Sequence, residues 1–352
     1  MTNQNHSVIF FDLSNSRNAE SFSSLMKERS PLILNPIENL LKELFICRFP
    51  KYKYDERSVE DLVHEHLKGQ NIDEYGLWIY YPWKNCIVHT LPEDEFIELR
   101  TSRNIYKITK EERINLSGKV IGVIGLSVGK SIATTVAMER ICGELKLADF
   151  DVIEMSNLNR LQGGITNIGL LKTVLTAREI AEIDPFIKVT CFHEGISENN
   201  IDAFLNQNKL DLLVEECDDL YVKLLSRLKS KEYKIPVVMH TSDSGMVDIE
   251  RFDTEINYDV FHGKLNDLSC DIQNRSEVNH HKKIILEQMI DFENLSLEMK
   301  KSFEEIGKTI NSWPQLASDV IAGAGMVTQI AREIMLKKTI ESGRYFHTLI
   351  KK

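Results

Sequence analysis

The chain has 352 residues, a length typical of two domains. Its formal net charge of −10 argues against a protein that binds nucleic acid or an anionic membrane surface, and no stretch reaches the roughly 18 apolar residues of a membrane span. Six cysteines without a C-x-x-C pair argue against a disulfide scaffold and against bound zinc, and an N-terminus without a basic, apolar leader predicts a cytoplasmic protein.

Residues 1–115 predict a small α+β domain. Apolar positions recur at helical spacing behind Asn35, a candidate N-cap, and two β-rich runs are joined by the turn Pro-Trp-Lys-Asn. We find no residue pattern typical of catalysis in this block. The predicted elements are helices over 36–48, 58–67 and 92–100 and a hairpin with strands over 77–81 and 86–91.

From Lys119 onwards, buried-strand patterns alternate with helices of 10–15 residues. This alternation predicts right-handed crossovers and a doubly wound, Rossmann-like, mainly parallel α/β sheet over residues 116–352. A polar excursion at about 252–295 interrupts the pattern, and its length indicates a functional or mobile segment. The expected strands are 119–125, 144–149, 187–192, 210–215 and 235–241, and the expected helices are 127–141, 169–183, 197–206, a segment ending near 230, 296–307 and 314–336.

Ligands of such a sheet bind beyond the carboxyl ends of its strands. The first of these ends carries Gly125, Ser127 and Lys130, and the following helix offers free N–H groups to phosphate. Asp149 comes 24 residues after Gly125, close to the spacing at which an acid meets a ribose in dinucleotide-binding proteins. The alternative is that Gly125 only makes a tight turn between strand and helix.

The next strand end is more specific, because a polar loop ends in an arginine. The segment ADFDVIEMSNLNR places Asp149 and Asp151 after the strand, followed by Asn157, Asn159 and Arg160. A simple NAD site needs one acid here, whereas a guanidinium can contact a polyphosphate through two hydrogen bonds. The segment therefore predicts nucleotide phosphate contacts. The alternative is a solvated acidic loop with a surface arginine.

Four carboxylates in five residues follow the strand at 210–215. Glu215, Glu216, Asp218 and Asp219 would repel one another unless a cation, basic side chains or a helix N-terminus stabilises them. The cluster indicates a metal site, although Asp218 and Asp219 could also cap the next helix. His240, at the end of a later strand, borders the expected pocket or belongs to the core.

Together these motifs resemble the ThiF/MoeB/HesA superfamily, the bacterial relatives of ubiquitin-activating enzymes. The run GLSVGKSIATTVAMERICGELKLADFDVIEMSNLNR aligns without gaps to its glycine-rich loop, its G-x-L-x-L-x-D-x-D strand and its S-N-L-N-R-Q motif. The resemblance covers residues 97–250. It includes a G-x-x-K helix start at Gly169-Leu-Leu-Lys172, an aspartate-terminated strand at 211–219, and an R-x-x-R-[QN] segment at Arg100-Thr-Ser-Arg103-Asn104.

The resemblance implies ATP- and Mg²⁺-dependent adenylation of a carboxylate, with release of pyrophosphate. Carried over by position, Asp149 would hold the ribose hydroxyls, and Asn159 and Arg160 would reach the phosphates. Lys172 would neutralise phosphate charge, and Asp218 would hold Mg²⁺. Arg160, Lys172 and Asp218 are therefore expected around one shared hollow.

The resemblance also implies a homodimer, because Arg103 usually completes the partner's site in this family. The sequence departs from the family where its later loop glycines fall on Ser127, Val128 and Lys130, and where the zinc-binding cysteine pairs are absent. Val128 narrows the approach of the backbone to phosphate, whereas Lys130 adds a charge. Cys217 and Cys270 are the candidates for a thioester cysteine, and we interpret both as buried, unreactive thiols.

The resemblance implies an adenylating enzyme that acts on a polypeptide. The large N-terminal block favours a precursor peptide of a ribosomal peptide natural product, with residues 1–115 recognising it. The alternative substrate is the C-terminus of a ubiquitin-like sulfur carrier. Two other functions stay open, an NAD(P)-dependent oxidoreductase and a ThiF-like binding protein without catalysis. An oxidoreductase leaves Arg160, Lys172 and the carboxylate cluster unexplained.

Overall fold

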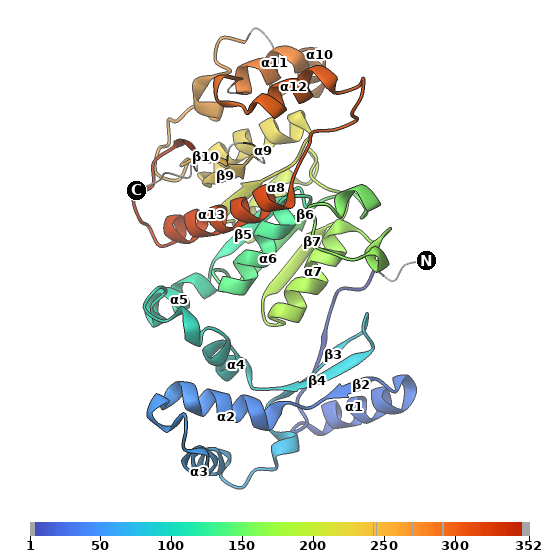
Figure 1. The fold of residues 1–352 in the computed structure, drawn as a ribbon, viewed down its shortest axis with the longest axis vertical. Helices are drawn as coiled ribbons and strands as arrows, with labels where there is room; N and C mark the ends of the chain where they lie inside the picture. Colours follow the sequence, from blue (N-terminus) through green and yellow to red (C-terminus); the bar gives the residue numbers. More distant parts are fainter. Residues whose placement is uncertain (1–3, 242, 244, 269–270, 291, 347–352) are drawn as a thin grey trace. The chain divides into compact units, whose positions relative to one another are not determined.

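The computed structural model describes residues 4–241, 243, 245–268, 271–290 and 292–346. These residues form two compact units, residues 4–110 and residues 111–346, each with its own hydrophobic core (Figure 1). The division falls inside helix α5, Lys110–Ser117, a few residues before the boundary expected from sequence.

The N-terminal unit has a four-stranded sheet in the order β1-β3-β4-β2. The predicted hairpin is confirmed, with β3 antiparallel to β4, and β2 adds a short parallel edge. The elements are β1 Ile9–Phe11, α1 Ser16–Arg29, β2 Leu32–Leu34, α2 Ile37–Arg48, α3 Glu56–Leu67, β3 Leu77–Tyr81, β4 Cys86–Thr90 and α4 Glu93–Arg100. The sequence pattern missed β1, α1 and β2, because the two strands have three residues each and α1 buries none of its side chains.

Asn35 does not cap α2 as expected. Pro36 occupies the N-cap position, and the Asn35 side-chain oxygen instead lies 2.9 Å from Nδ1 of His89. His89 is buried and stacks on Trp78 with 4.2 Å between the ring centroids. Trp78 and Tyr80 of the hairpin are therefore core residues, and Asn35 pairs with the buried polar ring of His89 beside them.

The larger unit contains a seven-stranded sheet in the order β11-β10-β9-β8-β5-β6-β7. Its strands are β5 Val120–Ile124, β6 Glu144–Ala148, β7 Lys188–Phe192, β8 Leu212–Glu215, β9 Val237–His240, β10 Met246–Glu250 and β11 Gly343–Phe346. The first five run parallel, and β10 and β11 complete one edge in antiparallel pairing. The doubly wound α/β prediction is confirmed. The strand order reverses between β5 and β8, which is where such folds bind ligands.

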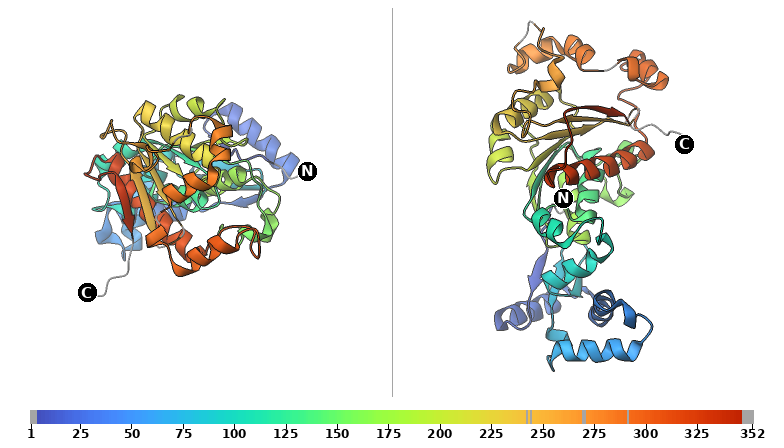
Figure 2. Two further views of the ribbon diagram at one scale, coloured as in Figure 1. Left: turned by 90° about the horizontal axis from the view of Figure 1, so that it is seen from above. Right: turned by 90° about the vertical axis from the view of Figure 1, so that its left-hand side faces the viewer.

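Helices cover both faces of this sheet. Helices α6, α7 and α13 pack against one another on one face, and α8 and α9 lie on the other (Figures 1 and 2). Their bounds are α6 Gly129–Glu139, α7 Lys172–Ile183, α8 Ile201–Asn206, α9 Leu220–Tyr233 and α13 Ala317–Met335. Among the residues that the structure describes, no helix combines the length and apolar character needed to cross a bilayer.

The excursion at 252–295 is more regular than its polar sequence suggests. It contains a 3₁₀ turn at Val260–Gly263 and helices α10, Arg275–His280, and α11, Lys282–Met289, and α12, Leu297–Glu305, follows it. A few widely spaced apolar residues anchor it on the core around α9. Sparse anchors produce no helical period in the sequence, which explains why the pattern did not predict these helices. The anchors are Phe252, Phe261, Leu265, Val278 and Ile285.

Candidate active site

The turn after β5 brings the chain close to the end of β8. Gly125 has φ +84°, and a Cβ on it would lie 2.7 Å from the backbone nitrogen of Cys217. Only glycine meets both demands without strain. The turn is further fixed by a hydrogen bond from the Leu126 backbone N–H to Oδ2 of Asp149, with 2.7 Å between nitrogen and oxygen. These contacts fix the turn after β5 beside the end of β8, where the strand order reverses.

Asp149, Asp151 and Lys172 lie close together at the carboxyl end of β6 and the start of α7. The Lys172 ammonium donates to Asp151 at 2.7 Å and lies 4.0 Å from Asp149. The Asp149 carboxylate is buried, and its two oxygens accept hydrogen bonds from the backbone N–H groups of Leu126 and Asp151. Burial raises the pKa of Asp149, and the Lys172 charge opposes that shift. The group joins the ends of β5 and β6 to the start of α7.

Ser127 and Lys130 follow in the same turn but take different positions. The Ser127 hydroxyl oxygen is buried and has no hydrogen-bond partner among the described residues. The Lys130 side chain is fully buried, and its ammonium pairs with Glu179 of α7. The expectation that Lys130 contacts phosphate is therefore corrected, because its position in α6 directs the side chain toward Glu179 of α7.

The polar turn after β6 holds Arg160 near the carboxylate cluster. Its Nη1 donates to the side chain of Asn159 at 2.9 Å, and its Nε is buried without a hydrogen-bond partner in the described part of the chain. Burial lowers the pKa of Arg160, and the charge of Asp218 opposes that shift, so these two groups interact electrostatically. Asn159 also donates to the Gln315 carbonyl at 2.8 Å. Asn157 is different, because its side-chain oxygen accepts from the Glu154 N–H and shapes the turn.

The cluster after β8 is stabilised in three ways. Glu215 is fully buried, and although burial alone would raise its pKa, the ammonium of Lys223 and the guanidinium of Arg227 lower it to about 2. Burial raises the pKa of Glu216 to about 8, so Glu216 is mostly neutral at pH 7. Asp219 accepts a hydrogen bond from the Val222 N–H and caps α9.

Asp218 remains exposed at the mouth of the site. The capping alternative thus applies to Asp219, while Asp218 lines the pocket at the ends of β8 and β9. The neighbouring Cys217 thiol donates to Glu215 at 3.0 Å, and burial raises its pKa well above the usual value. A thiol that stays protonated is a poor nucleophile, which supports the interpretation of Cys217 as a structural residue. Cys270 lies outside the described residues.

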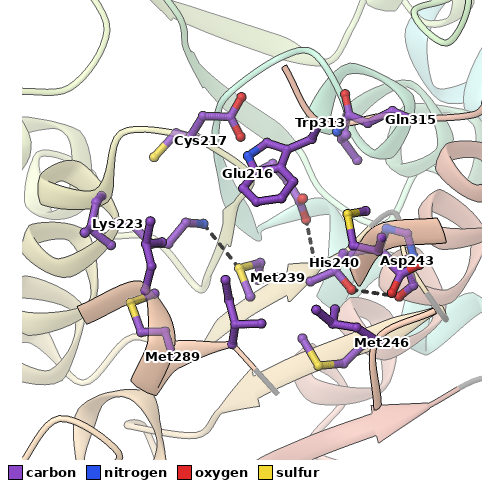
Figure 3. A pocket seen from close by; sticks show the side chains of 18 of the residues that line it. Glu216, Cys217, Lys223, Met239, His240, Asp243, Met246, Met289, Trp313 and Gln315 are labelled. Carbon is purple, nitrogen blue, oxygen red and sulfur yellow. Dashed lines mark hydrogen bonds between the residues drawn. The ribbon is translucent and has the colours of Figure 1, made fainter. Parts of the chain in front are cut away.

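The ends of β8 and β9 open into a pocket of about 330 Å³ (Figure 3). Figure 3 shows the labelled side chains of Glu216, Met239, His240 and Trp313 around this space. Asp218 and Val128 line the same pocket, so it adjoins the turn after β5. The backbone N–H of His240 donates to Glu216 at 2.7 Å and joins the two strand ends.

Arg160 lines a second hollow of about 600 Å³, which is separated from the first by residues 313–315 that line both. Lys172 lines neither. The expectation that Arg160, Lys172 and Asp218 surround a single hollow is therefore corrected. Residues 313–315 separate the hollow lined by Arg160 from the pocket lined by Asp218. The Lys172 ammonium is instead paired with Asp149 and Asp151.

His240 lines the pocket and is also buried, so it both borders the pocket and belongs to the core, which the sequence left as alternatives. Neither ring nitrogen has a hydrogen-bond partner among the described residues. Burial lowers its pKa to about 4, so the ring is neutral at pH 7. Gly323 of α13 packs on this ring so closely that a Cβ there would lie 2.1 Å from Cε1. Arg103, by contrast, is an exposed residue of the 3₁₀ turn Ser102–Asn104 in the N-terminal unit, and its role stays a prediction.

Several contributors were missed from the sequence. Lys223 and Arg227 lie four residues apart on α9, on the face toward Glu215, and this spacing behind an acidic strand end was an available signal. No sequence signal marked Arg344 of β11 or the methionines of the pocket, because tertiary packing brings these residues to the site from distant segments.

Comparison with known proteins identifies the family of the chain. The ThiF family model matches residues 101–292, more than half of the chain. The chain is 41% identical over 277 residues, 78% of its length, to the uncharacterized protein MT1398 of Mycobacterium tuberculosis (strain CDC 1551 / Oshkosh). It is 26% identical over 153 residues, 43% of its length, to the tRNA threonylcarbamoyladenosine dehydratase of Bacillus subtilis (strain 168). It spans 38% and 59% of the lengths of these two relatives.

Solved structures share the fold at low identity. The crystal structure of PaaA superimposes with a TM-score of 0.50 at 18% identity, covering 84% of this chain and 89% of that one. The tRNA N6-threonylcarbamoyladenosine dehydratase TcdA of E. coli does so with a TM-score of 0.50 at 16% identity, covering 68% and 95%. These similarities concern the fold alone. On the match of the family model, the chain belongs to the ThiF family.

Proposed function

We propose that the chain catalyses ATP-dependent adenylation of a polypeptide carboxylate. A carboxylate oxygen forms a bond to the α-phosphorus of ATP while the bond from that phosphorus to the oxygen of the β-phosphate breaks. Pyrophosphate leaves with the electron pair, and an acyl-adenylate remains. Membership of the ThiF family supports this reaction class.

The observation that carries the proposal is the set of ligand groups at the reversal of strand order. Asp149 accepts a hydrogen bond from the turn that follows Gly125 and pairs with Lys172. Arg160 and Asp218 interact electrostatically with each other. Two buried polar atoms there, Oγ of Ser127 and Nε of Arg160, have no partner among the described residues. Buried polar atoms are usually paired in proteins, so orphaned donors at this position support a bound anion. The phosphate oxygens of a nucleoside triphosphate would accept hydrogen bonds from both groups.

Asp218 fits the role of a magnesium ligand. Mg²⁺ prefers oxygen ligands and is commonly held by one or two carboxylates together with substrate phosphates. Asp218 offers an exposed carboxylate at the pocket mouth, within electrostatic reach of Arg160. The ion would supply charge neutralisation for the phosphates. Arg160 would contribute positive charge from the other side.

We further propose a precursor peptide as substrate, recognised by the N-terminal unit, with a ubiquitin-like sulfur carrier as the alternative. The edge strand β2 of that unit supports peptide recognition, since all three of its residues are apolar and exposed, Leu32 by 63%. An exposed sheet edge can accept a peptide as an added strand. Calorimetry with candidate precursor peptides would measure whether the protein binds them. Alanine substitutions along a peptide that binds would show which of its residues are recognised.

We also propose a homodimer in which Arg103 of one protomer completes the site of its partner. Arg103 is exposed and lies on a short 3₁₀ turn, so its guanidinium is free to reach another surface. Its position in the R-x-x-R-N segment supports this role. Sedimentation velocity at micromolar concentration would show a dimer, and a monomer with full activity would contradict the proposal.

Calorimetry with ATP and with NADH tests the nucleotide assignment. We expect ATP with Mg²⁺ to bind and NADH not to bind, and we expect Arg160→Ala to weaken ATP binding at least tenfold because a charge-assisted phosphate contact is lost. Lys301→Ala, an exposed change on α12, is the matched control. Tight NADH binding without ATP binding would instead support an oxidoreductase.

Exchange of labelled pyrophosphate into ATP tests the catalytic step itself. Adenylation is reversible, so label should enter ATP only when a carboxylate substrate is present. A protein that binds ATP but supports no exchange with any peptide or carrier would be a binding protein of the ThiF type. A protein whose melting temperature does not change with ATP would lack the nucleotide site altogether.

A further inference from the structure

One side of the pocket at the ends of β8 and β9 is lined by apolar side chains from segments far apart in the sequence. Four methionines come from β9, β10, α11 and α12, and leucine, isoleucine and aromatic residues fill the spaces between them. Figure 3 shows Met239, Met246 and Met289 around the same space. Methionine side chains adapt to irregular apolar groups. The four are Met239, Met246, Met289 and Met299.

The apolar part is continuous with the charged mouth. Val128, which follows the Gly125 turn, and Asp218 line the same pocket as Met289. An acyl group whose carboxylate reaches the phosphates at this turn would therefore place its neighbouring atoms in the apolar part.

The size of the pocket bears on the substrate. Its volume of about 330 Å³ lies at the lower end of the roughly 300–1,000 Å³ found for small-molecule sites. A peptide that ends in glycine has no side chain to place there, and an apolar space that its ligand does not fill contributes no hydrophobic stabilisation. We propose that the residue carrying the activated carboxylate has a bulky apolar side chain, such as leucine or phenylalanine, which occupies the methionine-lined pocket.

A second, independent observation indicates a ligand here. Arg344 of β11 lines the pocket with a side chain only 9% exposed. Its Nε pairs with Asp248 at 2.9 Å, whereas its Nη1 is buried and has no hydrogen-bond partner among the described residues. The neutral ring of His240 is in the same state. A peptide bond next to the apolar side chain would supply acceptors for Arg344 and a donor or an acceptor for His240.

The inference rests on the proposed adenylation and defines the class of its substrate. The test is pyrophosphate exchange by the full-length protein with three probes, N-acetyl-Ala-Ala-Leu, N-acetyl-Ala-Ala-Phe and N-acetyl-Ala-Gly-Gly. We expect the Leu and Phe peptides to support exchange at least tenfold faster than the Gly-Gly peptide. Equal or faster exchange with Gly-Gly would overturn the inference and leave adenylation standing.

Pocket filling sharpens the test. Met289→Trp places a larger group in the pocket, where Met289 is 7% exposed, and Met138→Trp makes the same change at an exposed site on α6. Met289→Trp should raise KM for the Leu peptide at least tenfold with ATP binding unchanged, and Met138→Trp should behave as wild type. Met299→Trp, at a partly exposed position of the pocket, replaces Met289→Trp if that variant does not fold.

Each remaining outcome is decisive. An unchanged KM in a folded pocket-filling variant would overturn the inference, because the pocket would then not hold the side chain. A protein that binds ATP but supports exchange with none of the three probes would also overturn it, while the nucleotide site would stand. Absence of ATP binding in calorimetry would instead remove the proposed function, and the inference with it.

Discussion

Glu215 and Glu216 are adjacent in the sequence, yet their carboxyl groups titrate far apart. The Glu215 carboxylate is paired with Lys223 and Arg227, which lower its pKa to about 2 against the effect of burial. Glu216 forms no ion pair with any described residue, and desolvation raises its pKa to about 8. The environment of each side chain, and not the acidic run itself, therefore decides which residue carries charge beside the proposed nucleotide site.

Replacement of Glu216 by glutamine should change how stability depends on pH. Because the folded pKa of Glu216 is raised from 4.5 to about 8, its neutral form stabilises the fold fully below pH 4.5, and this contribution is lost as pH rises through 8. Glutamine stays neutral and can still accept from the His240 N–H. The unfolding free energy of Glu216→Gln relative to wild type should rise by up to about 1.4 kcal/mol per pH unit from pH 5 to 8.

Urea unfolding monitored by circular dichroism at half-unit pH steps would measure this difference. Glu304→Gln, an exposed change on α12, is the control and should show no such slope. A flat difference for Glu216→Gln between pH 5 and 8 would mean that the carboxyl group is ionised in the folded protein.

Asp218 and Asp219 provide a matched pair for the proposed metal role. Asp218→Asn removes a charged oxygen ligand at the pocket mouth, and we expect pyrophosphate exchange to fall by about 100-fold or more. Asp219→Asn keeps an N-cap for α9, since asparagine caps helices as well as aspartate does, and should retain most activity. Exchange rates at several Mg²⁺ concentrations would measure both. Full activity in Asp218→Asn would refute the assignment.

At the scale of elements, strand ends could be predicted and side-chain directions could not. The alternation of strands and helices predicts that the carboxyl ends of β5, β6 and β8 share one edge of the sheet. The structure places Asp149 and Lys172 together at this edge, with 4.0 Å between their charged atoms. Lys130 sits one position inside α6, where helical register turns it toward Glu179. That register depends on packing between α6 and α7. The loop sequence contains no information about it.

Short and irregular elements were missed for a related reason. β1 and β2 have three residues each and exist through pairing with distant strands, so no local periodicity marks them. The helices of the excursion are anchored by a few buried side chains such as Phe261 and Ile285. Phe261 and α11 of this segment also line the pocket, so this part of the site could not be predicted from local pattern.

Helix α13 contains two glycines whose replacement should have opposite effects. A Cβ on Gly323 would meet the His240 ring at 2.1 Å, so Gly323→Ala overpacks the site and should destabilise the protein by about 1–3 kcal/mol. Gly325 has open space around its Cβ position, and Gly325→Ala should stabilise the helix by roughly 0.5–1 kcal/mol. Denaturant unfolding would measure both, and equal effects of the two changes would contradict this packing.

At the scale of the whole molecule, the proposed roles fall in two units. The larger unit contains the pocket and the proposed nucleotide-binding groups, and the N-terminal unit contains Arg103 and the exposed edge strand β2. The chain spans 38% of the Mycobacterium tuberculosis relative, so further activities of that protein are not implied for this one. The proposed reaction depends on groups of both units, and in the proposed dimer these come from different protomers.

Mixing two inactive variants tests this arrangement. In Arg103→Ala the partner's site lacks its arginine, and in Asp218→Asn the protomer's own site lacks its carboxylate. Random re-association gives half heterodimers, and in a twofold-symmetric dimer one of the two sites of each is intact, so about a quarter of wild-type exchange activity should return. No recovery from dimers shown to exchange subunits would mean that Arg103 does not act across the interface.

The most direct test of the central claim is an experimental structure of the protein with ATP and Mg²⁺. We predict that the ribose contacts Asp149 and that the phosphates lie between the Gly125 turn and the guanidinium of Arg160. We predict that the metal ion binds Asp218. A nucleotide bound elsewhere, or one that leaves these groups without contact, would contradict it.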